Sequence, residues 1–415
     1  MGPDASKPWS VSATLRGFYD DNTATIPNDS PTPAGSHRDS FGFEVIPAAA
    51  LVWSVQQTTV NVGLMYSLKY FDNKPAGQTD HTSQAFTFNA GLTHAFNERI
   101  KIEVADAFVI GQEPDTLRAG NTFSTFQRVN GDNIVNHGTI GLEAELTPRF
   151  GIGAGYDNSF YDYKNSEATL TPNGLGIQPS LSGSLDRIEN RAHIEGFYHL
   201  QPETKLLLGY QFTDINYTAD ELVGGDVTPF GIFNPLMSDY RNSRQHTVYV
   251  GAEHRFMPEL SGSLRVGASY TDFYNSNQDA KYSPYVLADL KYFYAPESYV
   301  QAGFSYDRSA TDVVGGGSGS STLDAGAAVV FVDVKHRITP YLFGSLLAQF
   351  QNSTYYGGFY DDKSEQFYLA GVDLEYRFNQ YISAHAGYNY DRLESDLPNR
   401  QFDRNRVYIG VTATY

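Results

Sequence analysis

Charged residues of both signs stand at alternate positions within otherwise apolar stretches of this sequence. In "IKIEVADAFVI" (100–110), for example, one apolar residue separates Lys101 from Glu103. Residues two apart project from the same face of a β-strand, so these charges would share one face. Such a face can tune the passage of ions, or its charges can pair with each other and stiffen a wall. The two roles are not exclusive, and the sequence favours neither. The candidate residues are Lys101, Glu103, Glu143, Glu145, Arg187, Glu189, Arg191, Glu195, Arg265, Asp289, Lys291, Asp333, Lys335, Asp373 and Glu375.

Catalytic and ligand-binding motifs are absent from the sequence. The ten His residues form no H-E-x-x-H pattern, no Ser lies in G-x-S-x-G, and "VVGGGSGSS" (313–321) lacks the Lys-Ser/Thr of a phosphate-binding loop. The chain has no Cys, which excludes disulfides and thiolate metal sites. Its net charge of −18 makes nucleic acid a poor partner. We therefore expect a protein that is not an enzyme and holds no cofactor or metal.

The elements that would position these charges are long alternating strands. In residues 366–390, apolar and aromatic residues occupy the even positions from Tyr368 to Phe378, and the alternation resumes after Gln380. This period of two is typical of a strand with one apolar and one polar face. Stretches such as 100–110, 204–214 and 260–274 hold about 10 residues or more, whereas strands of soluble proteins have a mode of about 5–6. Tilted strands of about 9–11 residues are long enough to cross a membrane.

The connections between these strands alternate between short and long. An apolar residue followed by a tight polar turn, often with Pro, marks the short ones. The long ones are rich in Gly, Asn, Asp and Ser. Their acidic excess, which includes Asp20, Asp220 and Asp391, suits a solvated outer surface better than a mouth that concentrates cations. Short turns are predicted near 55–60, 95–100, 146–151, 200–205, 256–261, 294–299, 338–343 and 378–383, and long loops near 21–39, 72–82, 112–133, 162–185, 217–241, 275–281, 309–321, 353–364 and 391–402.

Aromatic residues gather at both predicted ends of the strands, where lipid headgroups would lie. A soluble β-sandwich would explain the alternation, but not the strand length, the two aromatic belts or the alternating connections. We predict an all-β fold: a single antiparallel up-and-down transmembrane β-barrel of about 18 strands over residues 9–415, with short periplasmic turns and long extracellular loops. Residues 1–8 would form a short periplasmic segment. The membrane-interface residues predicted on the short-turn side are Trp9, Trp53, Phe96, Phe150, Phe256, Phe378 and Tyr415.

The last residues of the chain, "RVYIGVTATY" (406–415), resemble the C-terminal assembly signal of Gram-negative outer-membrane β-barrels. Val407, Ile409 and Val411 alternate before a terminal aromatic, Tyr415, where Phe is commoner. Among subgroups, the chain is most similar to the putative β-barrel porin 2 type. The resemblance implies a mature form without its signal peptide, located in the bacterial outer membrane among lipid and lipopolysaccharide. It also implies insertion by the outer-membrane assembly machinery and, by analogy, a homo-oligomer.

Three functions fit such a barrel. The first is a porin-like channel for passive diffusion of ions and small hydrophilic solutes through a charged lumen. The second is an export portal, for example for polysaccharide, that works with a periplasmic partner. The third is a structural or adhesive barrel with a blocked lumen, which a folded loop filling the lumen would favour. The sequence favours the first because the predicted inner face is charged and no other domain is predicted.

Overall fold

The computed structural model of this chain describes residues 7–32, 37–76, 80–111, 132–165, 168–170, 177–315 and 320–415. Within these residues, eighteen antiparallel strands form one sheet. The first and last of them, β1 (Trp9–Asp20) and β22 (Phe402–Thr414), pair with each other and close the sheet into a barrel. The predicted barrel and its strand number are therefore confirmed. Residues 1–6 of the predicted N-terminal segment lie outside the described residues.

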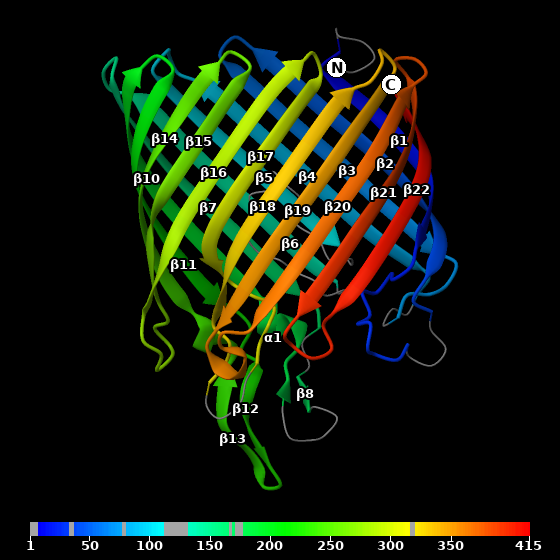
Figure 1. Cartoon of the computed structure of the whole chain (residues 1–415), viewed down its shortest axis with the longest axis vertical. Helices are drawn as coiled ribbons and strands as arrows, with labels where there is room; N and C mark the ends of the chain where they lie inside the picture. The colour runs from blue at the N-terminus through cyan, green and yellow to red at the C-terminus, as the bar shows by residue number, and fades with distance from the viewer. Residues whose placement is uncertain are drawn as a thin grey trace.

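The barrel strands follow one another around the wall in chain order (Figure 1). Between β1 and β22 they are β2 (Ser40–Val55), β3 (Thr58–Phe71), β4 (Thr82–Ala95), β5 (Ile100–Gly111), β6 (Asn133–Glu145), β7 (Phe150–Tyr163), β10 (Arg187–Gln201), β11 (Thr204–Tyr217), β14 (Ser243–Met257), β15 (Leu260–Asp272), β16 (Lys281–Ala295), β17 (Ser298–Ser309), β18 (Asp324–Arg337), β19 (Leu342–Tyr356), β20 (Ser364–Arg377) and β21 (Ile382–Ser395).

The short turns lie where the sequence predicts them, at the end of the barrel that also holds both chain ends (top of Figure 1). Side-chain oxygens fix several of these turns by accepting backbone N–H groups. Asn379 Oδ1 accepts from the N–H of Tyr381 at 2.8 Å and of Ile382 at 3.0 Å. Asn97 makes the same pair of bonds in a turn of the chain's first half, to the N–H groups of residues 99 and 100. Asn suits this position because its side chain mimics a backbone turn.

The long connections lie at the opposite end and carry the remaining small elements. Most of the predicted 112–133 loop lies outside the described residues, as does part of "VVGGGSGSS". The hairpin of β12 and β13 projects beyond the barrel (bottom of Figure 1). No helix of the described residues is long and apolar enough to cross a membrane. The loop elements are β8 (Thr169–Leu170), β9 (Ile177–Gln178), α1 (Leu181–Leu185), β12 (Leu222–Thr228), β13 (Gly231–Met237), and the 3-10 helices η1 (Ser238–Arg241) and η2 (Gly358–Tyr360).

The two faces of the wall differ as the alternation predicts. Outward side chains are apolar and exposed, such as Leu208 (61%), Val250 (60%) and Ile409 (69%). In water this exposure would be costly, whereas lipid accommodates it. All seven aromatic residues predicted at the short-turn interface are exposed, and their contact with headgroups stays a prediction. They are Trp9, Trp53, Phe96, Phe150, Phe256, Phe378 and Tyr415.

Candidate functional site

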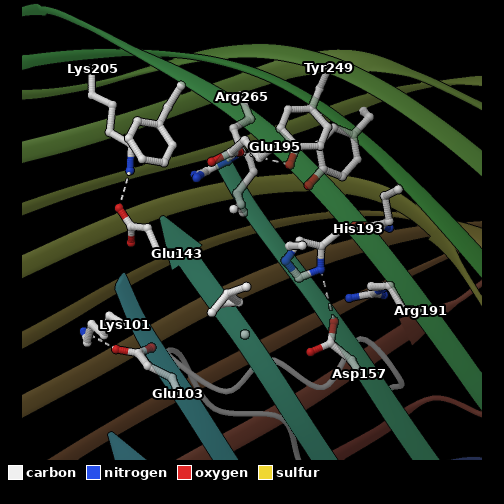
Figure 2. Close-up of a pocket in the computed structure, with 18 residues that line it drawn as sticks. Lys101, Glu103, Glu143, Asp157, Arg191, His193, Glu195, Lys205, Tyr249 and Arg265 are labelled. Carbon is white, nitrogen blue, oxygen red and sulfur yellow. Dashed lines mark hydrogen bonds and ion pairs between the residues drawn. The ribbon is translucent and has the colours of Figure 1, made fainter. Parts of the chain in front are cut away.

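A cavity of about 350 Å³ lies against the inner wall, from the middle of the barrel toward the short-turn end. Strands from β5 to β16 contribute its lining, which gathers six of the predicted charged residues (Figure 2). These six are Lys101, Glu103, Glu143, Arg191, Glu195 and Arg265. The cavity is thus the candidate site, and the strand alternation is what turns its charges inward.

A chain of ion pairs runs along this wall. Arg265 bridges two carboxylates: its Nε lies 3.3 Å from Glu195 Oε2, and its Nη2 lies 2.9 Å from Glu253 Oε1. Lys205 continues the chain, with Nζ 3.7 Å from Glu253 Oε2 and 3.6 Å from Glu143 Oε1. These side chains are between 14% and 52% exposed, so water reaches them and screens the pairs.

Aromatic rings laid over glycines hold part of this network in place. The ring of Tyr249 lies across Gly209 on the adjacent strand, where an added Cβ would stand 2.1 Å from Tyr249 Cζ. From there the Tyr249 hydroxyl donates to Glu195 at 3.0 Å. Phe197 covers Gly151 in the same way, and the ammonium of Lys205 lies 4.3 Å from the Phe197 ring centroid. Glycine at these positions therefore makes room for the rings that orient the charged groups.

Asp157, His193 and Arg191 form the middle of the cavity lining. His193 Nδ1 is 3.8 Å from Asp157 Oδ2. The Nε of Arg191 is buried and has no hydrogen-bond partner among the described residues. Cations and carboxylates are balanced in number: Lys101, Arg191, Lys205 and Arg265 stand against Glu103, Glu143, Asp157 and Glu195. Lys101 and Glu103 pair with each other on one strand.

The predicted residues on the later strands lie along another part of the inner wall, each beside a polar or aromatic partner. Asp289 accepts from Gln301 at 2.7 Å, and Asp333 accepts from the hydroxyl of Tyr299 at 2.9 Å. Asp373 likewise accepts from the hydroxyl of Tyr408 at 2.8 Å. Both Asp333 and Asp373 line a second cavity of about 130 Å³.

Three further predicted residues, two lysines and one glutamate, lie on the same part of the wall near the short turns. Lys291 Nζ lies 5.0 Å from the ring centroid of Tyr299, and Lys335 Nζ lies 6.0 Å from that of Phe343. Glu375 accepts from Arg377 two residues along its own strand, at 3.0 Å. The two ammonium–ring distances are short enough for the charge and the ring to attract each other, although solvent weakens this attraction at exposed sites.

The remaining predicted residues lie apart from the cavity. Arg187 and Glu189 are 1% and 8% exposed at the loop-side end of β10, where Arg187 Nε donates to Glu189 at 2.7 Å. Arg187 also donates to the carbonyl of Leu185, at 2.8 Å. Glu145 lies at the other end of the wall, 3.7 Å from His199 Nε2. The structure therefore does not bring these three residues together with the cavity.

Buried ion pairs at the loop-side end are the residues that sequence reasoning missed. Asp20 and Asp391 were expected on a solvated outer surface, but they are 2% and 1% exposed. Asp20 accepts from Arg404 Nε at 3.0 Å, and Asp391 accepts from Arg406 at 2.7 Å. Their positions at the strand ends hid this role, because the loops that bury them come from elsewhere in the chain. Arg404 and Arg406 lie on β22, the strand that pairs with both β1 and β21, so only the barrel closure reveals the first of these ion pairs.

The loops themselves are tied together over the barrel interior by Arg241, which is fully buried. Its guanidinium donates to the carbonyl of Ser184 at 2.9 Å and to that of Thr311 at 2.6 Å. It also lies 4.6 Å from the ring centroid of Tyr217. Burial lowers the pKa of Arg241, because the charged guanidinium loses water. This single side chain joins three long connections.

A half-buried carboxylate lies beside this junction. Asp186 follows α1 and accepts the backbone N–H of Tyr163 at 2.7 Å. Burial raises the pKa of Asp186 to about 6, because the charged carboxylate loses water, and the Tyr163 hydrogen bond opposes this only in part. In the described part of the chain, no group of His, Cys, Asp or Glu is arranged to hold a metal ion.

The closed barrel with an apolar exterior and a charged interior defines a porin-like β-barrel. Residues 317–415 match the family model described as "Putative beta-barrel porin 2". Together with the fold, this match confirms the predicted resemblance and the location in the bacterial outer membrane. No curated protein matches the chain.

The chain is similar to solved porins at low sequence identity. A BenF-like porin from Pseudomonas fluorescens Pf-5 is 11% identical, with 98% of this chain and 99% of that chain covered and a TM-score of 0.46. The outer membrane protein opdK from Pseudomonas aeruginosa is 12% identical, with both chains covered in full and a TM-score of 0.43. OccK9 (OpdG) from Pseudomonas aeruginosa is also 12% identical over both full chains, with a TM-score of 0.45.

Proposed function

We propose that this barrel conducts ions and small hydrophilic solutes by passive diffusion along its charged inner wall. The observation that carries the proposal is the cavity of about 350 Å³, whose charges are paired but remain open to water. A side chain that keeps part of its hydration can exchange a protein partner for a passing ion at small cost. The charged residues predicted from the sequence would then line the route.

The balance of charges in this cavity supports a weak rather than a strong ion preference. Equal numbers of cations and carboxylates largely cancel the field along the wall. Arg191 is the exception in its surroundings, because its Nε lacks a partner among the described residues. A guanidinium in this state is suited to a carboxylate or another planar anion on a solute. We propose Arg191 as the first contact for such a group.

A barrel with a closed lumen is the second candidate, and the loop-side packing favours it. The inner residues of the loop-side half, such as Thr247, Ser269 and Tyr355, are at most 1% exposed. Arg241 holds three loops together above them. Conduction would therefore require the loops to rearrange, whereas a structural or adhesive barrel would keep them fixed.

Single-channel conductance in a planar bilayer, with a salt gradient, distinguishes a conducting barrel from a barrel with a closed lumen. A conducting barrel gives steady or gated openings, and Arg241→Ala increases the open fraction because the loops lose their junction. Arg244→Ala serves as the matched control, since Arg244 is largely exposed and pairs with Asp214 on the outer face. Silence from correctly inserted wild type and Arg241→Ala alike would contradict conduction and leave the closed barrel.

We also propose that the exposed aromatic residues at the short-turn ends lie at the headgroup level of the inner leaflet. Trp9 and Tyr415 illustrate the arrangement, with ring centroids 5.9 Å apart on the strands that close the barrel. Assembly by the outer-membrane machinery, contact with lipopolysaccharide and a homo-oligomeric state remain proposals that rest on the resemblance.

A further inference from the structure

The barrel wall is incomplete at the seam between β16 and β17. Pairing between β16 and β17 starts at the short-turn end and stops at Val286 and Tyr306. Beyond that pair, Ser283, Pro284 and Tyr285 continue β16 but have no register partner in β17 among the described residues. They pair only with β15 on their other side. A strand edge left open inside a membrane is unusual, because lipid cannot satisfy its backbone groups.

The facing end of β17 is unpaired on the same side. Residues 307–309 belong to β17 and pair with β18 as far as Ser309 and Ala325, yet have no register partner in β16. The neighbouring β15–β16 seam also continues to its end, at Thr271 and Lys281. Pairing also lapses at Ile46 and Pro47 in the β2–β3 seam and beyond Phe86 in the β4–β5 seam. Of these gaps, the one between β16 and β17 lies beside the charged cavity, because Tyr285 lines that cavity.

The cause is that β17 turns into the barrel. Its lower end curves away from β16 in Figure 1. Asp307 there accepts from Gln245 Nε2 at 3.2 Å, and Gln245 lies on β14, two strands beyond β16. Arg308 is only 6% exposed and donates to Asp324 at 2.6 Å. Pro284 weakens the seam from the other side, since proline has no N–H for a ladder bond.

The seam connects two environments. On its inner side, Tyr285 and Leu287 line the charged cavity. On its outer side, Tyr282 is 79% exposed and Phe304 is 37% exposed, facing where lipid would be. A separation of β16 and β17 at this point would therefore connect lipid-facing aromatic residues with a cavity whose lining holds both charged and apolar side chains. At the loop-side end of the barrel, Arg241 ties the described parts of three loops together.

We propose that this seam is a lateral passage for a single-chain amphiphile between the cavity and the loop-side leaflet. The headgroup of the amphiphile would rest among the charges of the cavity, and its chain would lie along Tyr285 and Leu287 toward lipid. The passage goes beyond conduction of hydrophilic solutes and does not depend on it, because its route crosses the wall and does not run through the loop-side end. A transient separation of two already unpaired strand ends costs no ladder hydrogen bonds.

Labelling of single cysteines tests the passage, and the chain is suited to this because it contains no Cys. Tyr285→Cys and Gln211→Cys both place a thiol on the cavity wall, the first beside the seam and the second on β11. Each variant is placed in lipid nanodiscs and treated with N-dodecylmaleimide, which resides in the bilayer, or with a small charged maleimide in water. Val250→Cys, on the outer face of β14 where Val250 is 60% exposed, reports the rate at a lipid-facing position.

A lateral passage predicts that N-dodecylmaleimide labels Tyr285→Cys roughly tenfold faster than Gln211→Cys, because an intact wall shields the second thiol from lipid. The charged reagent corrects for differences in thiol reactivity between the two sites. Equal, slow labelling of both variants by the lipid reagent would overturn the proposal.

A second readout covers the case in which Tyr285→Cys does not fold. Tyr285→Trp and Gln211→Trp place a fluorescent side chain at the same two positions. A bromine-labelled alkyl amphiphile quenches tryptophan fluorescence on contact. Stronger quenching at position 285 than at 211, above the constant signal of Trp9 and Trp53, supports the passage. Equal quenching contradicts it. Neither result depends on whether the barrel conducts ions.

Discussion

Both halves of the barrel interior contain ion pairs between side chains, but the halves differ in how far water reaches these pairs. In the short-turn half, Lys101 and Glu103 pair while their side chains are 47% and 61% exposed. In the loop-side half, Arg308 and Asp324 pair at 4% and 8% exposure. An exposed pair contributes about 0–1 kcal/mol, and its partners exchange freely. A buried pair is costly to break, because the remaining charge stays buried alone. The first half is therefore suited to passing solutes, and the second to holding loops.

The largest contrast is expected from removing one carboxylate in each half. Asp324→Ala should lower the free energy of unfolding by about 3–5 kcal/mol, because it leaves Arg308 buried and unpaired. Glu103→Ala should change it by less than about 1 kcal/mol. Urea unfolding in lipid vesicles measures both. Similar effects at the two positions would remove the distinction between the halves.

Loss of the loop junction should have the next largest effect. Arg241→Ala leaves the carbonyls of Ser184 and Thr311 without their donor, at a cost of about 2 kcal/mol or more. The effect should concentrate in the loops, so hydrogen exchange should rise there and stay low in the short-turn half of the strands. A uniform rise throughout the barrel would show that Arg241 stabilises the whole wall instead.

Charge removal in the cavity should alter selectivity more than stability. Glu195→Gln removes one carboxylate from a balanced lining and leaves Arg265 paired with Glu253 alone, so the reversal potential of a conducting barrel should shift toward anions. Glu189→Gln is the control, because Glu189 is buried in the loop-side half and away from the cavity. A larger shift from the control than from Glu195→Gln would place the selective region in the loop-side half.

The smallest expected effect is a pH dependence at the loop junction. The pKa of Asp186 rises from its ordinary 3.8 to about 6 on folding, so the folded protein binds the proton more tightly than the unfolded chain. Stability from this group is complete below pH 4 and falls as pH rises to about 6. Asp186→Asn should flatten the stability profile in this window. If the stability of the variant still depends on pH in this window, the pH dependence arises from another group.

The sequence allowed the architecture to be predicted because its signals are local. The alternation through 366–390, together with residues such as Asn97 and Asn379 at the turns, specifies strands and short turns without reference to the rest of the chain. The inward parity of the charges follows from the same alternation. Six of the fifteen predicted residues consequently line one cavity.

Partners and loop packing could not be predicted in the same way. Arg265 meets Glu195 across 70 residues of sequence, through the register of three intervening seams. The inward turn of β17 and the burial of Asp20 depend on loops that pack from distant parts of the chain. Pro284 was the one local sign of the open seam, and a single proline at a strand end is equally compatible with an ordinary edge.

The pairing of β1 with β22 has a consequence for how the barrel comes into being. Thr14 and Thr412 touch across this seam at 2.7 Å, although they are separated by nearly the whole sequence. Until the last strand is available, any partly assembled sheet has two free edges that can pair with foreign strands. A nascent chain therefore needs protection until synthesis is finished, and shortening β22 by a few residues should leave an aggregation-prone open sheet rather than a slightly smaller barrel.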